Sequence, residues 1–295
     1  MFFNKVGGDG FLLDTYTGSA GAWSLRKLSS STTNVVRVQR DSDLVEQDFT
    51  PTQLTDGTLT TFASGGKCRA WKMYDQSGNG IDMIAPIIGL GIAPIITDAS
   101  GNLILLNGLP AIEQENNSLR CSLSAATTFP SGDGLLSTCF EVGAHISGAF
   151  TIGEACLSGI CAKTFLADRR SVLHSIEASG SAYAVRLQGG NTVFTSTDSA
   201  KQSVWTTYRD VANTGAPFKA RQDGVALVQS AAGSNVLSMD SDSAFTMFAN
   251  GTTEYGTSDP SIAQLRMQES IWWLSDNTSN ASGIETNMNN YYTIY

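Results

Sequence analysis

From about residue 103 onward, short apolar segments recur at regular intervals, separated by glycine, asparagine, aspartate and serine. Apolar and polar residues alternate within the segments, with the period of a half-buried strand. Two of the separating turns stand out, Gly189-Gly190-Asn191 and Asp223-Gly224. An Asp-Gly pair between alternating segments favours a tight hairpin turn. This spacing of short strands predicts an antiparallel sandwich rather than alternating strands and helices.

The composition agrees with a turn-rich β protein. The 295 residues are 41% apolar and only 15% charged, with 29 glycines, whereas charged residues usually make up about 25% of a globular domain. The net charge of −9 disfavours nucleic acid and anionic membranes as partners. The longest apolar run, Ile84–Ile96, contains two prolines and is too short to span a bilayer. We therefore expect no nucleic-acid partner and no membrane insertion.

The chain reads as an N-terminal arm over residues 1–30, followed by one sandwich domain over residues 31–295. Gly7-Gly-Asp-Gly10 would be a flexible joint within the arm. The start, Met1–Lys5, lacks the basic residues and apolar core of a secretory signal. Five cysteines without a pairing pattern indicate buried thiols in a protein folded in a reducing cytoplasm. They are Cys68, Cys121, Cys139, Cys156 and Cys161.

The C-terminal region predicts a long strand, Gln264–Leu274, and then a helix, Ala281–Tyr292. The polar run between the two supplies residue types that begin helices. Strict alternation along the strand would place Trp272 on the opposite face from Trp273, exposed or against another subunit. The position predicted for Trp272 assumes that the strand alternates regularly throughout.

Glu269 lies within this strand, and it is the one acid that we single out as buried. Alternation puts it on the face that carries Leu265, Met267, Ile271 and Trp273. An apolar environment favours the neutral form of a carboxyl group, which can then serve as a general acid. Two other interpretations stay open: a buried glutamate hydrogen-bonded to a neighbouring strand, or a bulge that turns the side chain outward.

A ten-residue string, Trp71–Gly80 (WKMYDQSGNG), ends an aromatic strand in a cluster of turn-forming residues. Such residues hydrogen-bond their own backbone and allow positive φ, so we expect a tightly folded loop. On the structural interpretation the polar side chains cap this loop. On the functional interpretation they bind sugar hydroxyls or a calcium ion, with an aromatic ring stacked on the sugar. The candidate carbohydrate-binding residues are Trp71, Tyr74, Asp75, Gln76 and Asn79.

This string and an earlier one, Leu12–Leu28 (LLDTYTGSAGAWSLRKL), together resemble an opening segment found in two groups of proteins. These groups are the fungal-type family 54 α-L-arabinofuranosidase catalytic domains and many bacteriophage virion proteins. The resemblance implies a concanavalin A-like fold, which is an all-β jelly-roll sandwich of two antiparallel sheets with a short C-terminal helix. It extends over the C-terminal strand and helix as well as the two strings.

The arabinofuranosidase resemblance also implies a nucleophilic glutamate and an acidic aspartate. At the position expected for the glutamate the chain has Gln188, and an amide cannot act as that nucleophile. In the region expected for the aspartate the only acid is Glu254, which is displaced. The paired neighbouring cysteines of those enzymes are missing too. We therefore assign no catalytic residue and no cofactor, and the metal content stays open.

The bacteriophage side of the resemblance carries the functional prediction. It implies a non-enzymatic virion structural protein: a capsid decoration, a head fibre or a tail-associated adhesin. Such a protein would assemble in the host cytoplasm with other virion proteins. We expect a homo-oligomer, with a trimer as the specific expectation, and a host-surface glycan as ligand. The alternatives are a divergent glycoside hydrolase of the arabinofuranosidase type and a free carbohydrate-binding module.

Overall fold

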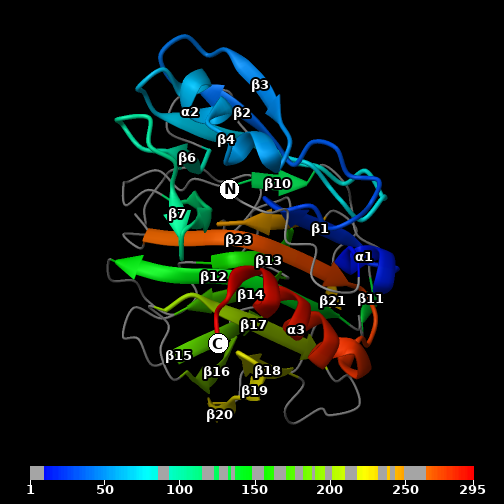
Figure 1. Ribbon diagram of the computed structural model, residues 1–295. Helices are drawn as coiled ribbons and strands as arrows, with labels where there is room; N and C mark the ends of the chain where they lie inside the picture. Colours follow the sequence, from blue (N-terminus) through cyan, green and yellow to red (C-terminus); the bar gives the residue numbers. More distant parts are fainter. Residues whose placement is uncertain are drawn as a thin grey trace.

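Nineteen strands of the described residues hydrogen-bond into one continuous antiparallel set, and four more form two small sheets (Figure 1). The computed structural model describes residues 10–85, 93–114, 123–125, 132–133, 137–147, 156–162, 171–176, 182–187, 190–196, 201–209, 218–231, 238–239, 243–248 and 264–295.

The large set folds over into two layers. The first layer consists, in pairing order, of β1 (Gly21–Ser24), β23 (Gln264–Trp273), β12 (Thr138–Ser147), β17 (Ser203–Arg209) and β18 (Phe218–Gln222). The second consists of β10 (Leu123–Ala125), β22 (Ser243–Met247), β13 (Cys156–Ala162), β14 (Ser171–Ile176), β15 (Ala182–Leu187) and β16 (Gly190–Thr195). The ring of Phe245 in the second layer lies 4.9 Å from that of Trp23 and 5.7 Å from that of Trp272. The layers therefore pack face to face.

The two layers are joined at both edges. At one edge the chain itself crosses: β19 (Val225–Ala226) pairs with β18, and β20 (Val228–Ala231), which follows it, pairs with β16. At the other edge, the strands between β23 and β10 are β9 (Ile112–Glu113), β6 (Ile95–Thr97), β4 (Cys68–Met73) and β5 (Met83–Ile84). Two further strands continue outward from β4: β2 (Val36–Arg40) and β3 (Glu46–Phe49).

The smaller elements complete the fold. The two-stranded sheets pair β7 (Leu105–Leu106) with β8 (Leu109–Pro110), and β11 (Gly132–Asp133) with β21 (Ser238–Met239). The helices are α1 (Leu12–Thr15), the 3-10 turn η1 (Thr52–Leu54), α2 (Thr58–Ala63), the 3-10 turn η2 (Thr278–Asn280) and α3 (Ala281–Tyr292).

Helix α3 covers the outer face of the first layer. It buries Ile284, Met288 and Tyr292, which are spaced by one helical turn and so share one face. They pack in one apolar cluster with Ile271 and Trp273 of β23. The helix predicted at about Ala281–Tyr292 is confirmed. The all-β antiparallel sandwich with a C-terminal helix is confirmed as well.

The predicted hairpin at Asp223-Gly224 is also confirmed. The two residues have φ of 53° and 78°, the positive values of a primed turn between twisted strands. The predicted N-terminal arm needs correction from residue 21 on, because Gly21–Ser24 forms β1 and pairs with β23. Trp23 is fully buried in the core between the layers. The boundary predicted at residue 30 therefore lies inside the sandwich.

Two β-bulges change which side chains face inward. Arg37 pairs with Lys72 and Val38 with Ala70, so Trp71 is an extra residue in β4. Val142 likewise pairs with Glu269 and Gly143 with Met267, which makes Gln268 the extra residue in β23. A bulge of this kind reverses the alternation beyond it.

The bulge at Gln268 overturns the assumption that β23 is regular. Leu265, Met267 and Trp272 all belong to the core between the layers, whereas Ile271 and Trp273 face α3. Trp272 is fully buried, so the prediction that it is exposed or meets another subunit is wrong.

Candidate functional site

The carboxylate of Asp75 closes the predicted loop. Its Oδ1 accepts hydrogen bonds from the backbone N–H of Ser77 at 2.9 Å and of Ala22 at 3.0 Å. Its Oδ2 accepts from Ser77 Oγ at 2.7 Å and from the N–H of Ile81 at 3.0 Å. Two of these bonds lie within the loop, one holds Ile81 directly after it, and the fourth reaches Ala22 of β1. Asp75 therefore shapes the loop and ties it to the start of the sandwich.

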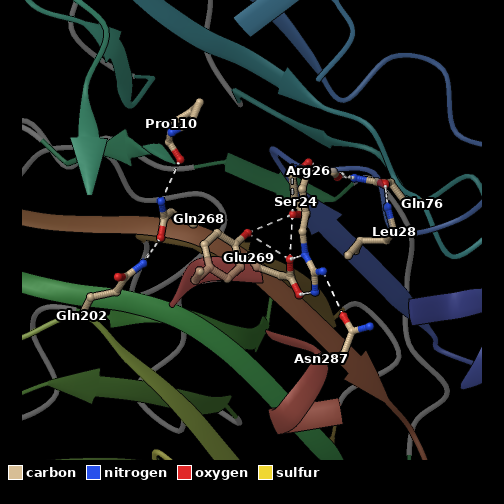
Figure 2. A network of polar contacts seen from close by, with 10 residues as sticks. Ser24, Arg26, Leu28, Gln76, Pro110, Gln202, Gln268, Glu269 and Asn287 are labelled. Carbon is tan, nitrogen blue, oxygen red and sulfur yellow. Dashed lines mark hydrogen bonds and ion pairs between the residues drawn. The ribbon is translucent and has the colours of Figure 1, made fainter. Parts of the chain in front are cut away.

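Gln76 extends this tie to the residues that follow β1, as Figure 2 shows. Its Oε1 accepts from the N–H of Leu28 at 2.7 Å, and its Nε2 donates to the carbonyls of Ser24 and Arg26 at 2.8 and 3.0 Å. The side chain is buried. Gln76 thus joins the two sequence strings that carry the family resemblance, and its amide is directed into the protein.

Asn79 and Trp71 also face their own protein. Asn79 Nδ2 donates to the carbonyls of Ser19 and Ala20 at 2.8 and 3.1 Å. Trp71, at the bulge of β4, is 9% exposed and belongs to the core between the layers. The structure therefore brings Asp75, Gln76 and Asn79 together around the segment that contains β1, and it places the Trp71 ring away from them.

Tyr74 differs from these four residues in its partners: it is half-buried, and its side chain contacts β3 and β4 instead of the segment around β1 or the core. Its Oη donates to Asp48 Oδ1 at 2.7 Å. Partial burial and then the neighbouring Asp48 carboxylate raise the pKa of Tyr74 to about 12. The phenol therefore stays protonated at neutral pH, and it can both donate and accept a hydrogen bond.

The surface around Tyr74 is built by three neighbouring strands in register. Asp48 of β3 pairs with Arg37 of β2, and Arg37 pairs with Lys72 of β4. Arg37 holds Asp48 through two hydrogen bonds, Nε to Oδ1 at 2.6 Å and Nη2 to Oδ2 at 3.0 Å. The Lys72 ammonium contacts Asp82 Oδ2 at 2.6 Å and lies 4.6 Å from the centre of the Tyr74 ring. We call this surface the Tyr74 face; it comprises Arg37, Glu46, Asp48, Lys72, Tyr74 and Asp82.

Glu269 is fully buried, and its carboxylate is paired with Arg26. Arg26 Nε donates to Oε2 at 2.6 Å and Nη2 donates to Oε1 at 2.8 Å. Oε2 also accepts from Ser24 Oγ at 2.9 Å (Figure 2). The same oxygen accepts from Tyr292 Oη at 3.0 Å. The apolar surroundings on which the general-acid interpretation of Glu269 depends are therefore not present.

The guanidinium group of Arg26 contacts a carboxylate, an amide oxygen and two aromatic rings. Burial by itself lowers the pKa of Arg26, but the charge and hydrogen bonds of Glu269 outweigh burial, so the pKa is raised. Its Nη1 donates to Asn287 Oδ1 at 2.9 Å, and the group lies 4.8 and 5.5 Å from the ring centres of Tyr291 and Tyr292. The pair therefore fastens the segment after β1 to β23 and to α3.

A second buried acid, Glu141 of β12, was not singled out from the sequence. It accepts a hydrogen bond from Ser158 Oγ of β13, which in turn contacts Ser270 Oγ and Trp272 Nε1 at 3.3 Å each. The sequence pattern that could have identified Glu141 as buried is its position in an alternating strand, two residues from the buried Cys139. Glu141 lies between the layers and Glu269 on the outer face, so the two do not flank a common space.

Gln188 and Glu254, the positions at which the resemblance implies catalytic carboxylates, lie outside the described residues. Among the residues that the structure describes, no group of three or more His, Cys, Asp or Glu side chains is arranged to hold a metal ion. In the same part of the chain, no helix has the length and apolar character needed to cross a membrane.

The fold is similar to that of solved arabinofuranosidases. One is an arabinofuranosidase complexed with arabinofuranosyl-α-1,2-xylobiose, with a TM-score of 0.61 and 19% identity over 94% of this chain. A second is a GH54 α-L-arabinofuranosidase soaked with a cyclic sulfate inhibitor, with a TM-score of 0.54 and 17% identity over 94% of this chain. This chain spans 64% of the length of each. No protein-family model matches the chain. Comparison with curated proteins gives no match.

Proposed function

We propose that the protein is a non-catalytic glycan-binding sandwich that serves as a structural component of a bacteriophage virion. The main support for glycan binding is the likeness of nearly the whole chain to an arabinofuranosidase solved with an arabinofuranosyl-xylobiose. The Tyr74 face supports the same proposal, because it offers an aromatic ring beside a fixed carboxylate and guanidinium. The ligand would be a glycan of the host surface.

The pairing of buried acids supports a non-catalytic role. Glycoside hydrolysis needs two carboxylates that reach one glycosidic bond, one of them protonated. Of the four buried glutamates among the described residues, Glu269, Glu113 and Glu285 each form an ion pair with an arginine, and Glu141 accepts a hydrogen bond from Ser158. A buried carboxylate paired with an arginine stabilises the fold and is not suited to donate a proton to a glycosidic oxygen. The glycosidase alternative depends instead on Glu254, which lies outside the described residues.

A binding and hydrolysis experiment separates these functions. The intact protein is applied to a glycan array and, in parallel, incubated with an aryl-α-L-arabinofuranoside. We expect glycan binding without release of the aryl group. Turnover that disappears in Glu254→Gln and persists in Asp43→Asn would replace the proposal with the arabinofuranosidase alternative. Asp43 is a suitable control because it forms an exposed pair with Arg40 and is not among the acids implied to be catalytic.

The virion role rests on the resemblance of Leu12–Leu28 and Trp71–Gly80 to the opening segment of virion proteins. The test is mass spectrometry of particles purified from cells in which the gene is expressed during infection, with light scattering of the isolated protein. We expect the protein in the particles at fixed stoichiometry, and a trimer in solution. A monomer that is absent from purified particles would favour the free carbohydrate-binding module.

A further inference from the structure

We infer that the Tyr74 face is the glycan-binding surface and that it selects neutral sugars over acidic ones. The inference rests on the proposed glycan-binding function, to which it adds a location and a ligand class. It moves the expected sugar contact from the interior of the Trp71–Gly80 loop to the open face of β2, β3 and β4 beside it. Three observations carry it: the register of the strands, the unused hydrogen-bonding capacity, and the charge.

The register holds the polar groups of the face in fixed positions. Asp48, Arg37 and Lys72 lie side by side on three adjacent strands, and their side chains are between 22% and 39% exposed. Each is also held by a neighbour: Arg37 by Asp48 and Lys72 by Asp82. Side chains that are already ordered lose little conformational entropy when a ligand binds.

The groups that are paired on the Tyr74 face still have hydrogen-bonding positions with which to contact a sugar. A carboxylate offers about four acceptor positions, and Asp48 uses three of them, two for Arg37 and one for Tyr74. Tyr74 Oη donates to Asp48 and its own lone pairs can accept a sugar hydroxyl. Ile84 of β5, opposite Lys72 in the register and 38% exposed, adds an apolar contact. The donors and acceptors suit the hydroxyl groups of a sugar, which both donate and accept hydrogen bonds. The apolar surface suits its C–H groups.

The charge of the face sets the ligand class. Arg37 and Lys72 already face three carboxylates, those of Asp48, Glu46 and Asp82. The formal charge of these five groups is therefore −1, within a chain of net charge −9. A sialic acid or uronic acid would meet compensated cations and an excess of negative charge. An arginine available for bidentate pairing is the favoured partner of a carboxylate, and Arg37 already pairs with Asp48 in this way, so the Tyr74 face is suited to neutral sugars.

The first arm of the test uses the wild-type protein on an array of neutral glycans, bacterial-surface and arabinoxylan oligosaccharides among them, and of sialylated and uronic-acid glycans of similar size. We expect binding to neutral members only. Stronger binding to the acidic glycans would overturn the ligand class. Binding to no glycan at all would overturn the proposed function together with this inference.

The second arm locates the site with variants of the face. Tyr74→Ala removes the ring, and Asp48→Asn removes the carboxylate charge; each should weaken the neutral-sugar binding of the wild type about tenfold or more. Tyr74→Phe keeps the ring and should lose less. The matched control is Asp43→Asn, which breaks the Arg40–Asp43 pair on the same hairpin and should bind as the wild type does. Circular dichroism and melting confirm that each variant is folded. Unchanged binding by folded Tyr74→Ala and Asp48→Asn would overturn the location and leave glycan binding standing.

Discussion

Arg26 and Glu269 are separated by 243 residues in the sequence and meet inside the protein, joined by two hydrogen bonds of 2.6 and 2.8 Å. Arg26 follows β1 and Glu269 lies in β23, the two strands that pair at Ser24 and Glu269. Tyr292 of α3 donates to the same carboxylate. One ion pair thus connects an early segment of the described chain to the last strand and the last helix.

Replacing Glu269 with Gln should destabilise the protein strongly. The amide keeps the shape of the side chain but leaves the Arg26 guanidinium, 5% exposed, without its anion. Breaking a buried ion pair from one side costs about 3–5 kcal/mol. Denaturant unfolding of the two proteins measures this difference in the free energy of unfolding.

The Arg40–Asp43 pair supplies the control for this measurement. It has the same closest N–O distance of 2.6 Å but an Asp43 side chain that is 44% exposed, so Asp43→Asn should leave the free energy of unfolding nearly unchanged. The double variant Arg26→Met, Glu269→Leu should recover part of the loss, because no charge is left unpaired. A Glu269→Gln protein within about 1 kcal/mol of the wild type would contradict the assigned role.

Gln76→Glu tests the join between the loop and the segment after β1. The substitution keeps an acceptor for the N–H of Leu28 but turns an oxygen toward the carbonyls of Ser24 and Arg26, to which the wild-type amide donates. We expect a loss of about 2–4 kcal/mol at pH 7, since buried groups are left unsatisfied. The loss should shrink near pH 4, where a protonated Glu can donate once. Melting temperatures at the two pH values check this, and equal stability of the variant and the wild type at pH 7 would refute it.

Asp75→Asn tests whether the loop acts mainly as architecture. In the wild type, Oδ2 accepts a hydrogen bond from the N–H of Ile81. The NH₂ group of an Asn at this position would place a second donor opposite that N–H. We expect a loss of about 2–3 kcal/mol in unfolding free energy, with glycan affinity per folded molecule unchanged. Asp98→Asn is the control, because Asp98 caps an exposed turn through the N–H groups of Ser100 and Asn102. Reduced glycan affinity in an Asp75→Asn protein of unchanged stability would assign the loop a direct sugar contact.

The sequence predicts local features of this fold well and its irregularities poorly. The helix Ala281–Tyr292 and the primed turn at Asp223-Gly224 depend on short-range preferences, and both match the structure. The bulges at Trp71 and Gln268 follow from strand pairings with distant segments. Alternation alone does not show them, which is why Trp272 was placed on the wrong face.

The candidate site divides in the same way. The residue types predict that Asp75 caps its own turn, because an Asp side chain often hydrogen-bonds the backbone two residues further along the chain. The partners of Gln76 lie about 50 residues away, and Arg26 is far from Glu269, so no spacing rule reveals either contact. The Tyr74 face needs three strands in register before Arg37, Asp48 and Lys72 become neighbours. A pattern read along one strand cannot supply that arrangement.

High pH provides the last prediction, through Tyr74. Partial burial and then the Asp48 carboxylate raise its pKa to about 12 in the folded protein, above the ordinary value of 10.0. Folding therefore favours the protonated phenol. The resulting contribution to stability is complete below pH 10 and is lost as the pH rises toward 12. Asp48→Asn should lower the pKa of Tyr74 toward 10, because it removes the charge beside the phenol.

Difference spectra of phenolate absorbance measure this effect. Subtracting the titration of Tyr74→Phe from that of the wild type isolates the single phenol. The same subtraction in the Asp48→Asn background gives the shifted titration. The difference is needed because burial also raises the pKa of Tyr292 well above its ordinary value, so other tyrosines titrate late too. A Tyr74 titration that is identical with and without the Asp48 carboxylate would show that the hydrogen bond between them does not form in solution. The fixed geometry of the Tyr74 face, which depends on that bond, would then be absent.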